Sequence, residues 1–355
     1  MAQDVFILGA GASQQGGAPL MNNFLDTAFS LYWKNKVSPQ NKEHFKKVIE
    51  AVGILQHVHS KAHLDHINLE SVFATFEMAA ALNKFGEYPP SKITALIESM
   101  RILIVETIEK TLGFPFIEKS LQPPRPYMEY AKLINHLCQE VVPNRKAAII
   151  TFNYDIAVDF ALSLSGMPVS YALENSPQGI PLLKLHGSMN WARCTGCKKI
   201  VPVNMDEFFS KIPIRFPLPN MFIPIAASLK FFECKACKIP LPIEPVIVPP
   251  TWDKSQYREG LRSVWARAAK ELTDAERIYV MGFSLPPTDS FFRQLYALGT
   301  AGPNPLNRFW VFDVDETGAV EGRFRNLLGS GALPRFNYFK HSFENGIKQL
   351  LQSSH

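Results

Sequence analysis

Two Cys-x-x-Cys motifs are the feature that most constrains this chain. The first closes the stretch 184–197, which reads KLHGSMNWARCTGC, and the second lies further downstream. Two such motifs can wrap one Zn²⁺ ion tetrahedrally, and a closed shell of four thiolates leaves no position for a substrate. We therefore predict a small structural zinc-binding module over residues 192–243, with four free cysteines as the alternative. The predicted ligands are Cys194, Cys197, Cys234 and Cys237.

A histidine precedes the first of these motifs. The apolar run 180–185 leads directly into His186 and Gly187, so His186 is expected where a strand ends. Open α/β sheets bind their ligands at the carboxyl ends of strands. Because imidazole can accept a proton near neutral pH, His186 is a candidate general base. The alternative is a histidine whose partners lie in the protein core.

The chain begins with a strand followed by a glycine-rich turn. Residues 4–8 (DVFIL) lead into GAGAS and then Gly16-Gly17. Small residues let the backbone approach a pyrophosphate, and a following helix offers free N–H groups. The spacing is not G-x-G-x-x-G, so an ordinary tight turn is the alternative. The candidate binding residues here are Gly9, Ala10, Gly11 and Ser13.

A second strand end carries polar residues. Residues 146–153 (KAAIITFN) are continuously apolar up to the asparagine, as in a strand buried on both faces of a parallel sheet. Asn153, Tyr154 and Asp155 follow, and a helix continues to about residue 164. Asp155 and Asp159 have a simple explanation, since carboxylates favour the first turn of a helix. Asn153 has no such explanation and is therefore a candidate site residue.

Strands and helices alternate along the rest of the chain. Further strands are expected at 245–248, 277–283 and 308–314, and the chain ends in a helix at 343–351. Gly282 and Ser284 lie at the end of one of these strands, and Asp313 near the end of another. This alternation predicts an α/β fold with a Rossmann-like, mostly parallel sheet that has helices on both faces.

A long helical region interrupts this alternation. Apolar residues recur at spacings of three and four over 24–33, 45–58, 69–82, 93–112 and 127–137. The region is too long for one crossover, so we predict a helical insertion at 22–140. The predicted Rossmann-like domain then comprises residues 1–21, 141–191 and 244–355.

Composition excludes several classes of protein. The 355 residues are 46% hydrophobic and 19% charged, as in a soluble globular protein. The net charge of +5 is small and no dense Lys/Arg tract is present, so there is no direct evidence for nucleic-acid binding. With neither a basic-then-apolar leader nor a long apolar stretch, we expect a cytoplasmic protein without membrane association. Paired cysteines fit a reducing compartment.

Taken together, the ordered motifs resemble the sirtuin family. They are GAGAS (9–13), TFNYD (151–155), KLHGS followed by the two Cys-x-x-Cys pairs, and GFSLPPTD (282–289). The resemblance covers the chain apart from the helical insertion. It implies a Rossmann-type NAD-binding domain with a small zinc module.

Two departures from the standard sirtuin pattern narrow the resemblance. Standard sirtuins have a G-I-P-D-F-R-type stretch after the first glycine turn, and residues 17–24 here lack its Asp and Arg. Standard sirtuins also have an F-G-E stretch after the zinc module that helps to hold the acyl-lysine peptide, and residues 248–251 (VPPT) stand in its place here. With the insertion segment 68–73, these departures resemble the bacterial sirtuin-like NAD hydrolases of antiphage defence. The resemblance implies an NAD glycohydrolase that releases nicotinamide and ADP-ribose and depletes NAD. The alternatives are an NAD-dependent protein deacylase and a non-catalytic NAD or ADP-ribose sensor.

The resemblance also implies roles for the candidate residues. Asn153 would hold a ribose hydroxyl or the attacking water, and His186 would accept a proton from one of them. Asp155 would contact the nicotinamide amide. Gly282 and Ser284 would meet the diphosphate or the adjacent ribose. The remaining candidate, Asp313, would bind the hydroxyls of the adenosine ribose, with a strand-end cap as its alternative.

Control of an NAD hydrolase is expected, because its unregulated activity would harm the cell. The candidates are a homo-oligomer, a co-encoded ATPase or nuclease partner, and occlusion of the NAD cleft by the insertion. We expect the insertion to leave and rejoin the domain at the ligand-binding edge of the sheet. The prolines at 89–90 and 123–124 are expected to stiffen its joints and keep its helices separate from the core.

Overall fold

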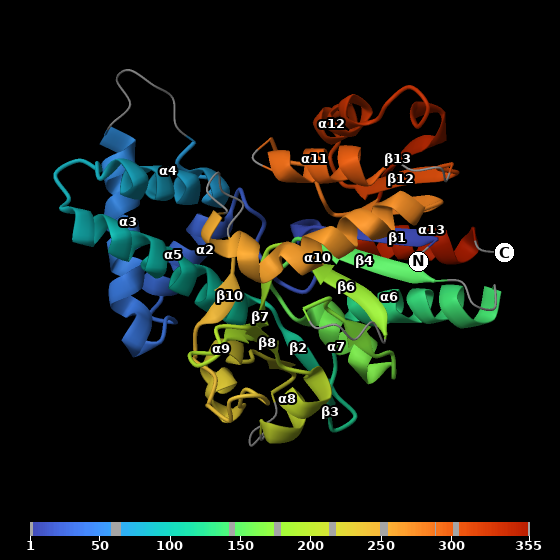
Figure 1. Ribbon diagram of the computed structural model, residues 1–355. Coiled ribbons are helices and arrows are strands. Elements are labelled where there is room, and N and C mark those ends of the chain that lie inside the picture. The colour runs from blue at the N-terminus through green and yellow to red at the C-terminus, as the bar shows by residue number, and fades with distance from the viewer. Residues whose placement is uncertain are drawn as a thin grey trace.

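The sheet at the centre of the molecule has seven parallel strands in the order β13-β12-β11-β1-β4-β6-β5 (Figure 1). The computed structural model describes residues 3–57, 65–141, 146–173, 179–212, 218–248, 255–287, 289–300 and 305–353. The strands are β1 (Asp4–Leu8), β4 (Ala147–Thr151), β5 (Val169–Ser170), β6 (Ile180–Lys184), β11 (Arg277–Met281), β12 (Arg308–Asp313) and β13 (Phe336–Lys340). The predicted α/β fold is confirmed.

The order of the strands defines where a ligand can bind. From β1 the chain moves outward through β4 to β6, and later from β11 through β12 to β13 in the opposite direction. Neighbouring parallel strands in a doubly wound sheet leave a crevice outside their carboxyl ends where this direction reverses. That switch point lies between β1 and β11, which pair over their whole length from Asp4↔Arg277 to Leu8↔Met281.

Helices cover both faces of this sheet, as predicted (Figure 1). One layer contains α6 (Arg125–Asn135), α7 (Ala157–Leu164) and α13 (Phe343–Gln352), and the other contains α10 (Ser255–Asp274), α11 (Ser290–Gly299) and α12 (Ala319–Leu327). Phe6 in β1 and Tyr130 in α6 meet edge to face with ring centroids 5.6 Å apart. Every residue of β1 is buried, because the strand lies between the two layers.

The predicted insertion 22–140 divides into two parts in space. Helices α2 (Phe24–Trp33), α3 (Lys42–His57), α4 (Leu69–Leu82) and α5 (Pro90–Thr111) pack on one another beside the sheet (Figure 1). Helix α6, by contrast, belongs to the layer on the sheet and leads the chain back to β4. The apolar core is continuous between insertion and sheet. The expectation that the prolines keep the insertion separate from the core is therefore wrong, because its helices bury their apolar faces against that core.

Two small antiparallel sheets lie below the main one. The first contains β7 (Gly187–Arg193), β8 (Ile200–Pro202) and β10 (Pro245–Ile247); the first cysteine motif lies between β7 and β8, and the second precedes β10. The second joins β2 (Phe114–Ile117) and β3 (Ser120–Leu121) to β9 (Asn220–Met221), so it connects the insertion region to the predicted zinc module. Of these short strands only β10 was expected, at 245–248, and it pairs antiparallel with β7 instead of joining the parallel sheet of the predicted Rossmann-like domain.

The remaining elements are short. They are α1 (Ala10–Gln14), α8 (Met205–Lys211), α9 (Ile225–Ser228), η1 (Pro39–Asn41), η2 (His136–Val141), η3 (Leu229–Phe231) and η4 (Leu333–Arg335). Within the part of the chain that the structure describes, no helix has the length and apolar character needed to cross a bilayer.

Candidate functional site

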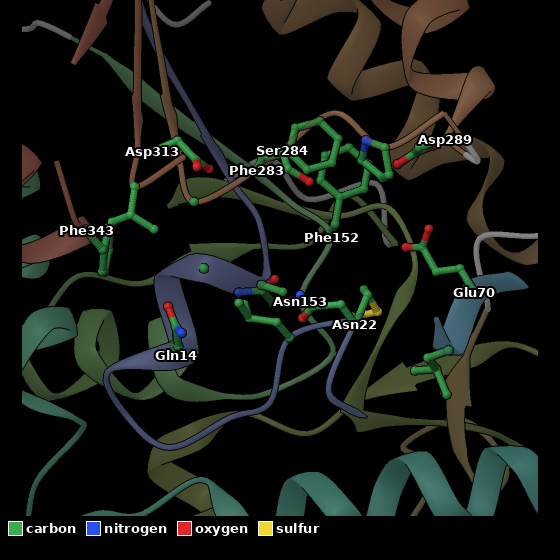
Figure 2. A pocket seen from close by; sticks show the side chains of 18 of the residues that line it. Gln14, Asn22, Glu70, Phe152, Asn153, Phe283, Ser284, Asp289, Asp313 and Phe343 are labelled. Carbon is green, nitrogen blue, oxygen red and sulfur yellow. The ribbon is translucent and has the colours of Figure 1, made fainter. Parts of the chain in front are cut away.

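A cavity of about 330 Å³ opens at the carboxyl edge of the sheet, beside the switch point (Figure 2). Most of the residues predicted from the sequence line it. These are Ala10, Gly11, Asn153, His186, Gly282, Ser284 and Asp313. Three predicted residues, Gly9, Ser13 and Asp155, are not part of the lining. Asp155 and Ser13 are instead buried, at 4% and 1% exposure. Ser13 contacts Asn153 in the cavity floor, and Asp155 contacts Ser13 from behind.

The glycine turn after β1 packs against the turn after β11. The Gly11 N–H donates to the Gly282 carbonyl at 2.9 Å, and a Cβ at Gly9 would lie 2.6 Å from the same oxygen. Gly282 has φ +63°, and a Cβ there would collide with the backbone of Ala12. The glycines therefore let two protein loops cross at the switch point. The glycine-rich motif predicts space for a pyrophosphate, but protein backbone fills the space next to Gly9.

Asn153 lies two residues beyond the end of β4 and is held firmly. Its Nδ2 donates to the Gly9 carbonyl and to Ser13 Oγ, both at 3.0 Å, with a longer contact of 3.4 Å to the Tyr127 hydroxyl. These bonds direct the amide nitrogen into the protein. The carbonyl oxygen Oδ1 is consequently the polar atom that the side chain can offer to the cavity.

Asp155 is a buried anchor for this floor. Its Oδ2 accepts a hydrogen bond from Ser13 Oγ at 2.7 Å, and its Oδ1 accepts one from the Ala157 N–H at 3.0 Å. Burial raises the pKa of the Asp155 carboxyl, while the nearby Lys184 ammonium acts in the opposite direction. The expected contact between Asp155 and nicotinamide stays a prediction, and the contacts of this carboxylate are with protein groups that support Asn153.

His186 is placed where the main sheet meets the β7 sheet. It follows β6 and precedes Gly187, whose φ of +82° turns the chain into β7. The His186 carbonyl accepts a hydrogen bond from the Val248 N–H at 2.8 Å, and its ring meets Phe152 edge to face with centroids 5.2 Å apart. With 4% exposure, the imidazole is confined between the two sheets at the wall of the cavity.

Asp313 and Ser284 form one end of the cavity. Asp313 is the last residue of β12, and burial raises the pKa of its carboxyl. Its Oδ1 accepts a hydrogen bond from the Asp315 N–H at 2.9 Å, which is the strand-end cap considered above. Because the side chain also lines the cavity, the cap and a ligand contact are compatible. Arg323 Nε donates to the Ser284 carbonyl at 2.8 Å and holds that loop in place.

Two buried carboxyl groups that sequence reasoning missed line the cavity on the side away from Asp313 (Figure 2). Glu70, 7% exposed, lies in the first turn of α4, and Asp289, 2% exposed, precedes α11. Both raise the pKa of the buried Tyr154 phenol, although burial itself is the larger cause. Both lie in segments that carry the sequence resemblance, Asp289 in 282–289 and Glu70 in 68–73, but neither was predicted as a site residue. Among the described residues of the lining, none is Lys or Arg.

The four predicted metal ligands converge into one cluster. Their sulfur atoms all lie within 4.8 Å of one another, and the two halves have matching backbone geometry. The Lys198 and Lys238 N–H groups donate to the carbonyls of Cys194 and Cys234, at 3.0 and 2.8 Å, and both lysines have positive φ. Two similar knuckles that present four thiols at this spacing are compatible with a tetrahedral structural Zn²⁺.

Comparison with known proteins gives structural likeness only. Neither a family model nor a curated protein matches the chain. Among solved structures, the chain is similar to a Sir2 homolog in complex with NAD, with a TM-score of 0.44, 16% identity and coverage of 99% of this chain and 90% of that one. It is also similar to a mutant Sir2 homologue in complex with ADP-ribose, with a TM-score of 0.41, 16% identity and coverage of 99% and 91%.

Proposed function

We propose that this protein is an NAD glycohydrolase that cleaves the bond between nicotinamide and ribose, releasing nicotinamide and ADP-ribose. The observation that carries the proposal is the convergence of Asn153 and His186 at one cavity outside the switch point of the sheet. This is where a doubly wound sheet binds a dinucleotide. The sequence resemblance to the sirtuins points to the same substrate.

The reaction needs positioning and charge stabilisation rather than an acid. The nicotinamide of NAD is already a cationic leaving group, and its departure leaves an oxocarbenium-like ribose. Asn153 Oδ1 can hold a ribose hydroxyl or the attacking water, because its amide nitrogen is bonded to Gly9 and Ser13. His186 can accept the proton that this hydroxyl or water gives up. The proton finally passes to solvent.

The acidic end of the cavity suits the cationic half of the substrate. Glu70 and Asp289 lie on the side away from Asp313, and Figure 2 shows the Glu70 carboxylate directed into the cavity from α4. Negative charge there would favour both the pyridinium ring and the oxocarbenium ion that replaces it. Asp313, at the other end, would bind the hydroxyls of the adenosine ribose. In this arrangement the insertion contributes Glu70 directly to the site.

The test is nicotinamide release from NAD by the purified protein, with and without an acylated peptide. Release that does not depend on peptide supports the glycohydrolase. Strict dependence on peptide would instead support an NAD-dependent deacylase, for which the cysteine cluster is the favouring observation. Binding of NAD or ADP-ribose without release in any assembly would support a sensor. Residues 249–251, part of the stretch that departs from the acyl-peptide pattern, lie outside the described residues.

The preference of the cavity for the cationic pyridinium of NAD gives a second test of the same site. Replacing Glu70 by Gln removes one negative charge from the cavity with little change in volume. NAD turnover should fall by tenfold or more (about 1.4 kcal/mol), while ADP-ribose, which lacks the pyridinium, should bind within about twofold of wild type. Glu87→Gln is the control, since Glu87 is an exposed carboxylate between α4 and α5 that does not line the cavity. An equal loss in both variants would contradict a local role for Glu70.

The cellular role that we propose follows from the same resemblance: depletion of NAD in antiphage defence, in the cytoplasm. Such an enzyme requires control, and a homo-oligomer or a co-encoded ATPase or nuclease would provide it. Because Asn68, Leu69, Glu70, Phe73 and Ile104 of the insertion line the cavity, a shift of its helices would change the site itself. Turnover and mass measured across one concentration series would test this. Full activity in a monomer at every concentration would contradict control by assembly.

A further inference from the structure

A buried tyrosine contacts the residues behind Asn153 without reaching the cavity. Tyr127 lies in the first turn of α6 and is 1% exposed. Its hydroxyl is 2.7 Å from Ser13 Oγ and 3.4 Å from Asn153 Nδ2. Its ring packs on Phe343 in α13, with centroids 5.2 Å apart. The hydroxyl is therefore held at the centre of the hydrogen bonds that support Asn153.

The direction of each hydrogen bond in this group is determined by Asp155. The Lys184 ammonium favours the ionised form of Asp155 against the effect of burial. Because an ionised carboxylate only accepts, Ser13 uses its single proton for the bond to Asp155 Oδ2 at 2.7 Å. The Ser13 oxygen can then only accept from its other neighbours. Tyr127 consequently donates its proton to Ser13, and burial keeps that proton in place by raising the phenol pKa well above its usual value.

The same directions allow only one orientation of the Asn153 amide. Nδ2 has two protons, one for the Gly9 carbonyl and one for Ser13 Oγ. In the flipped amide, Oδ1 would face the Gly9 carbonyl and a Ser13 oxygen that has no proton to give. Both contacts would then be repulsive, and two buried acceptors would lack a donor. Oδ1 is therefore directed to the cavity by the bonds behind the residue.

We propose that Tyr127 is a positioning residue for the reaction: its hydroxyl, acting through Ser13, fixes the Asn153 amide with Oδ1 towards the substrate. This rests on the function proposed above, in which Oδ1 holds a ribose hydroxyl or water. Without the Tyr127 proton, one lone pair of Ser13 loses its donor and the hydroxyl is no longer held from both sides. The Asn153 amide then gains freedom to rotate, and productive orientation is a large part of such catalysis.

The chain offers a matched pair of variants for the test. Tyr127→Phe removes the hydroxyl and keeps the ring against Phe343. The control is Tyr130→Phe, one turn later on α6: Tyr130 is 0% exposed and also packs on Phe343, at 5.4 Å. Its hydroxyl has no hydrogen-bond partner among the described residues. The two substitutions therefore make the same chemical change on the same helix, and only one of them touches the bonds behind Asn153.

Steady-state kinetics give the first readout. Tyr127→Phe should lower kcat for NAD cleavage by tenfold or more and change KM by less than about threefold, because the substrate still fits but the amide is misoriented. Tyr130→Phe should keep wild-type kcat and KM. Ser13→Ala, which removes the hydroxyl between Tyr127 and Asn153, should also lower kcat. Wild-type kcat in Tyr127→Phe, or an equal loss in both tyrosine variants, would overturn the proposal.

The second readout needs no activity. In a sample with ¹⁵N-labelled asparagine, the side-chain NH₂ pair of Asn153 is identified by its loss in Asn153→Ala. In Tyr127→Phe this pair should shift and exchange faster with water, and in Tyr130→Phe it should match the wild type. An unchanged pair in Tyr127→Phe would refute positioning, whatever the kinetics. A changed pair in a protein that cleaves no NAD would refute the proposed function and leave the positioning of Asn153 intact.

Discussion

The Lys184 ammonium lies 2.7 Å from the Asp159 carboxylate, and neither side chain is exposed to solvent at all. The same ammonium donates to the Asp155 carbonyl at 2.5 Å, and Asp159 accepts a further bond from the Tyr171 hydroxyl at 2.6 Å. Two charges are thus buried beneath the candidate site, each with several partners. Such a pair adds little net stability over apolar residues of equal volume, but each half depends on the other.

Replacing one member of this ion pair should lower the free energy of unfolding far more than replacing both members. Lys184→Met leaves the Asp159 carboxylate buried without its cation, and should lower the free energy of unfolding by about 3–5 kcal/mol. Lys184→Met combined with Asp159→Leu should recover part of this loss. Urea unfolding of the two variants against wild type provides the measurement. A cost below about 1 kcal/mol for the single variant would show that water reaches the pair.

Alanine substitutions of Asn153 and His186 should reduce nicotinamide release to different extents. Asn153→Ala should abolish nicotinamide release at a stability cost of about 1–2 kcal/mol, since the amide bonds to Gly9 and Ser13 are lost. His186→Ala should slow release about a hundredfold, the usual scale for a lost general base. Single-turnover assays, with thermal unfolding alongside, measure both. Normal turnover in a folded Asn153→Ala protein would remove Asn153 from the mechanism.

The turns after β1 and β11 pack so closely that a methyl group at Gly282 should destabilise the protein. Gly282→Ala places a Cβ against the Ala12 backbone at φ +63° and should destabilise the protein by about 3 kcal/mol or more. Gly322→Ala is the control, because Gly322 lies inside α12 with nothing within 4 Å of the added Cβ. That change should be neutral or stabilise by up to about 1 kcal/mol. Similar melting temperatures for the two variants would argue against the close approach.

Metal content should follow the cysteine cluster. Elemental analysis of the purified protein should find about one Zn per chain, because four convergent thiolates suit one tetrahedral ion. Cys194→Ser should lower both the zinc content and the melting temperature. Cys138→Ser should change neither, since Cys138 lies in η2, outside the cluster. A stable wild-type protein that contains no metal would disprove the structural zinc.

One carboxyl group should make stability depend on pH near neutrality. Burial raises the pKa of Glu109 in α5 to about 7, and its Oε1 accepts a hydrogen bond from the Ala226 N–H at 2.7 Å. The folded state therefore binds a proton more tightly than the unfolded state, so stability falls as pH rises from about 4.5 to 7.

Glu109→Gln should remove that dependence. Gln keeps an oxygen for the Ala226 N–H and cannot ionise. Relative to the wild type, the variant should gain about 2 kcal/mol between pH 5.5 and pH 8, since one pKa unit corresponds to about 1.4 kcal/mol. Unfolding of both proteins across this range gives the difference directly, which cancels the titration of other groups. Parallel curves would place the pKa of Glu109 near its ordinary value.

The sequence by itself determined the elements and most of the site. Continuous apolar runs such as 5–8 and 278–281 are buried on both faces and form strands of the parallel sheet. The polar residues that follow such runs, Asn153 and Asp313 among them, line one cavity because parallel strands end at the same edge. The cysteine spacing likewise predicted a cluster that the structure brings together.

Only the tertiary structure decided what each of these residues contacts. Glu70 reaches the cavity because α4 packs beside the sheet, a relationship between segments far apart in the chain. Tyr127 and Ser13 are separated by 114 residues, and Ser13 and Asp155 by 142, yet their bonds set the orientation of Asn153. Periodicity reports how one element faces the core, whereas hydrogen-bond direction depends on which atoms the whole fold brings within 3 Å.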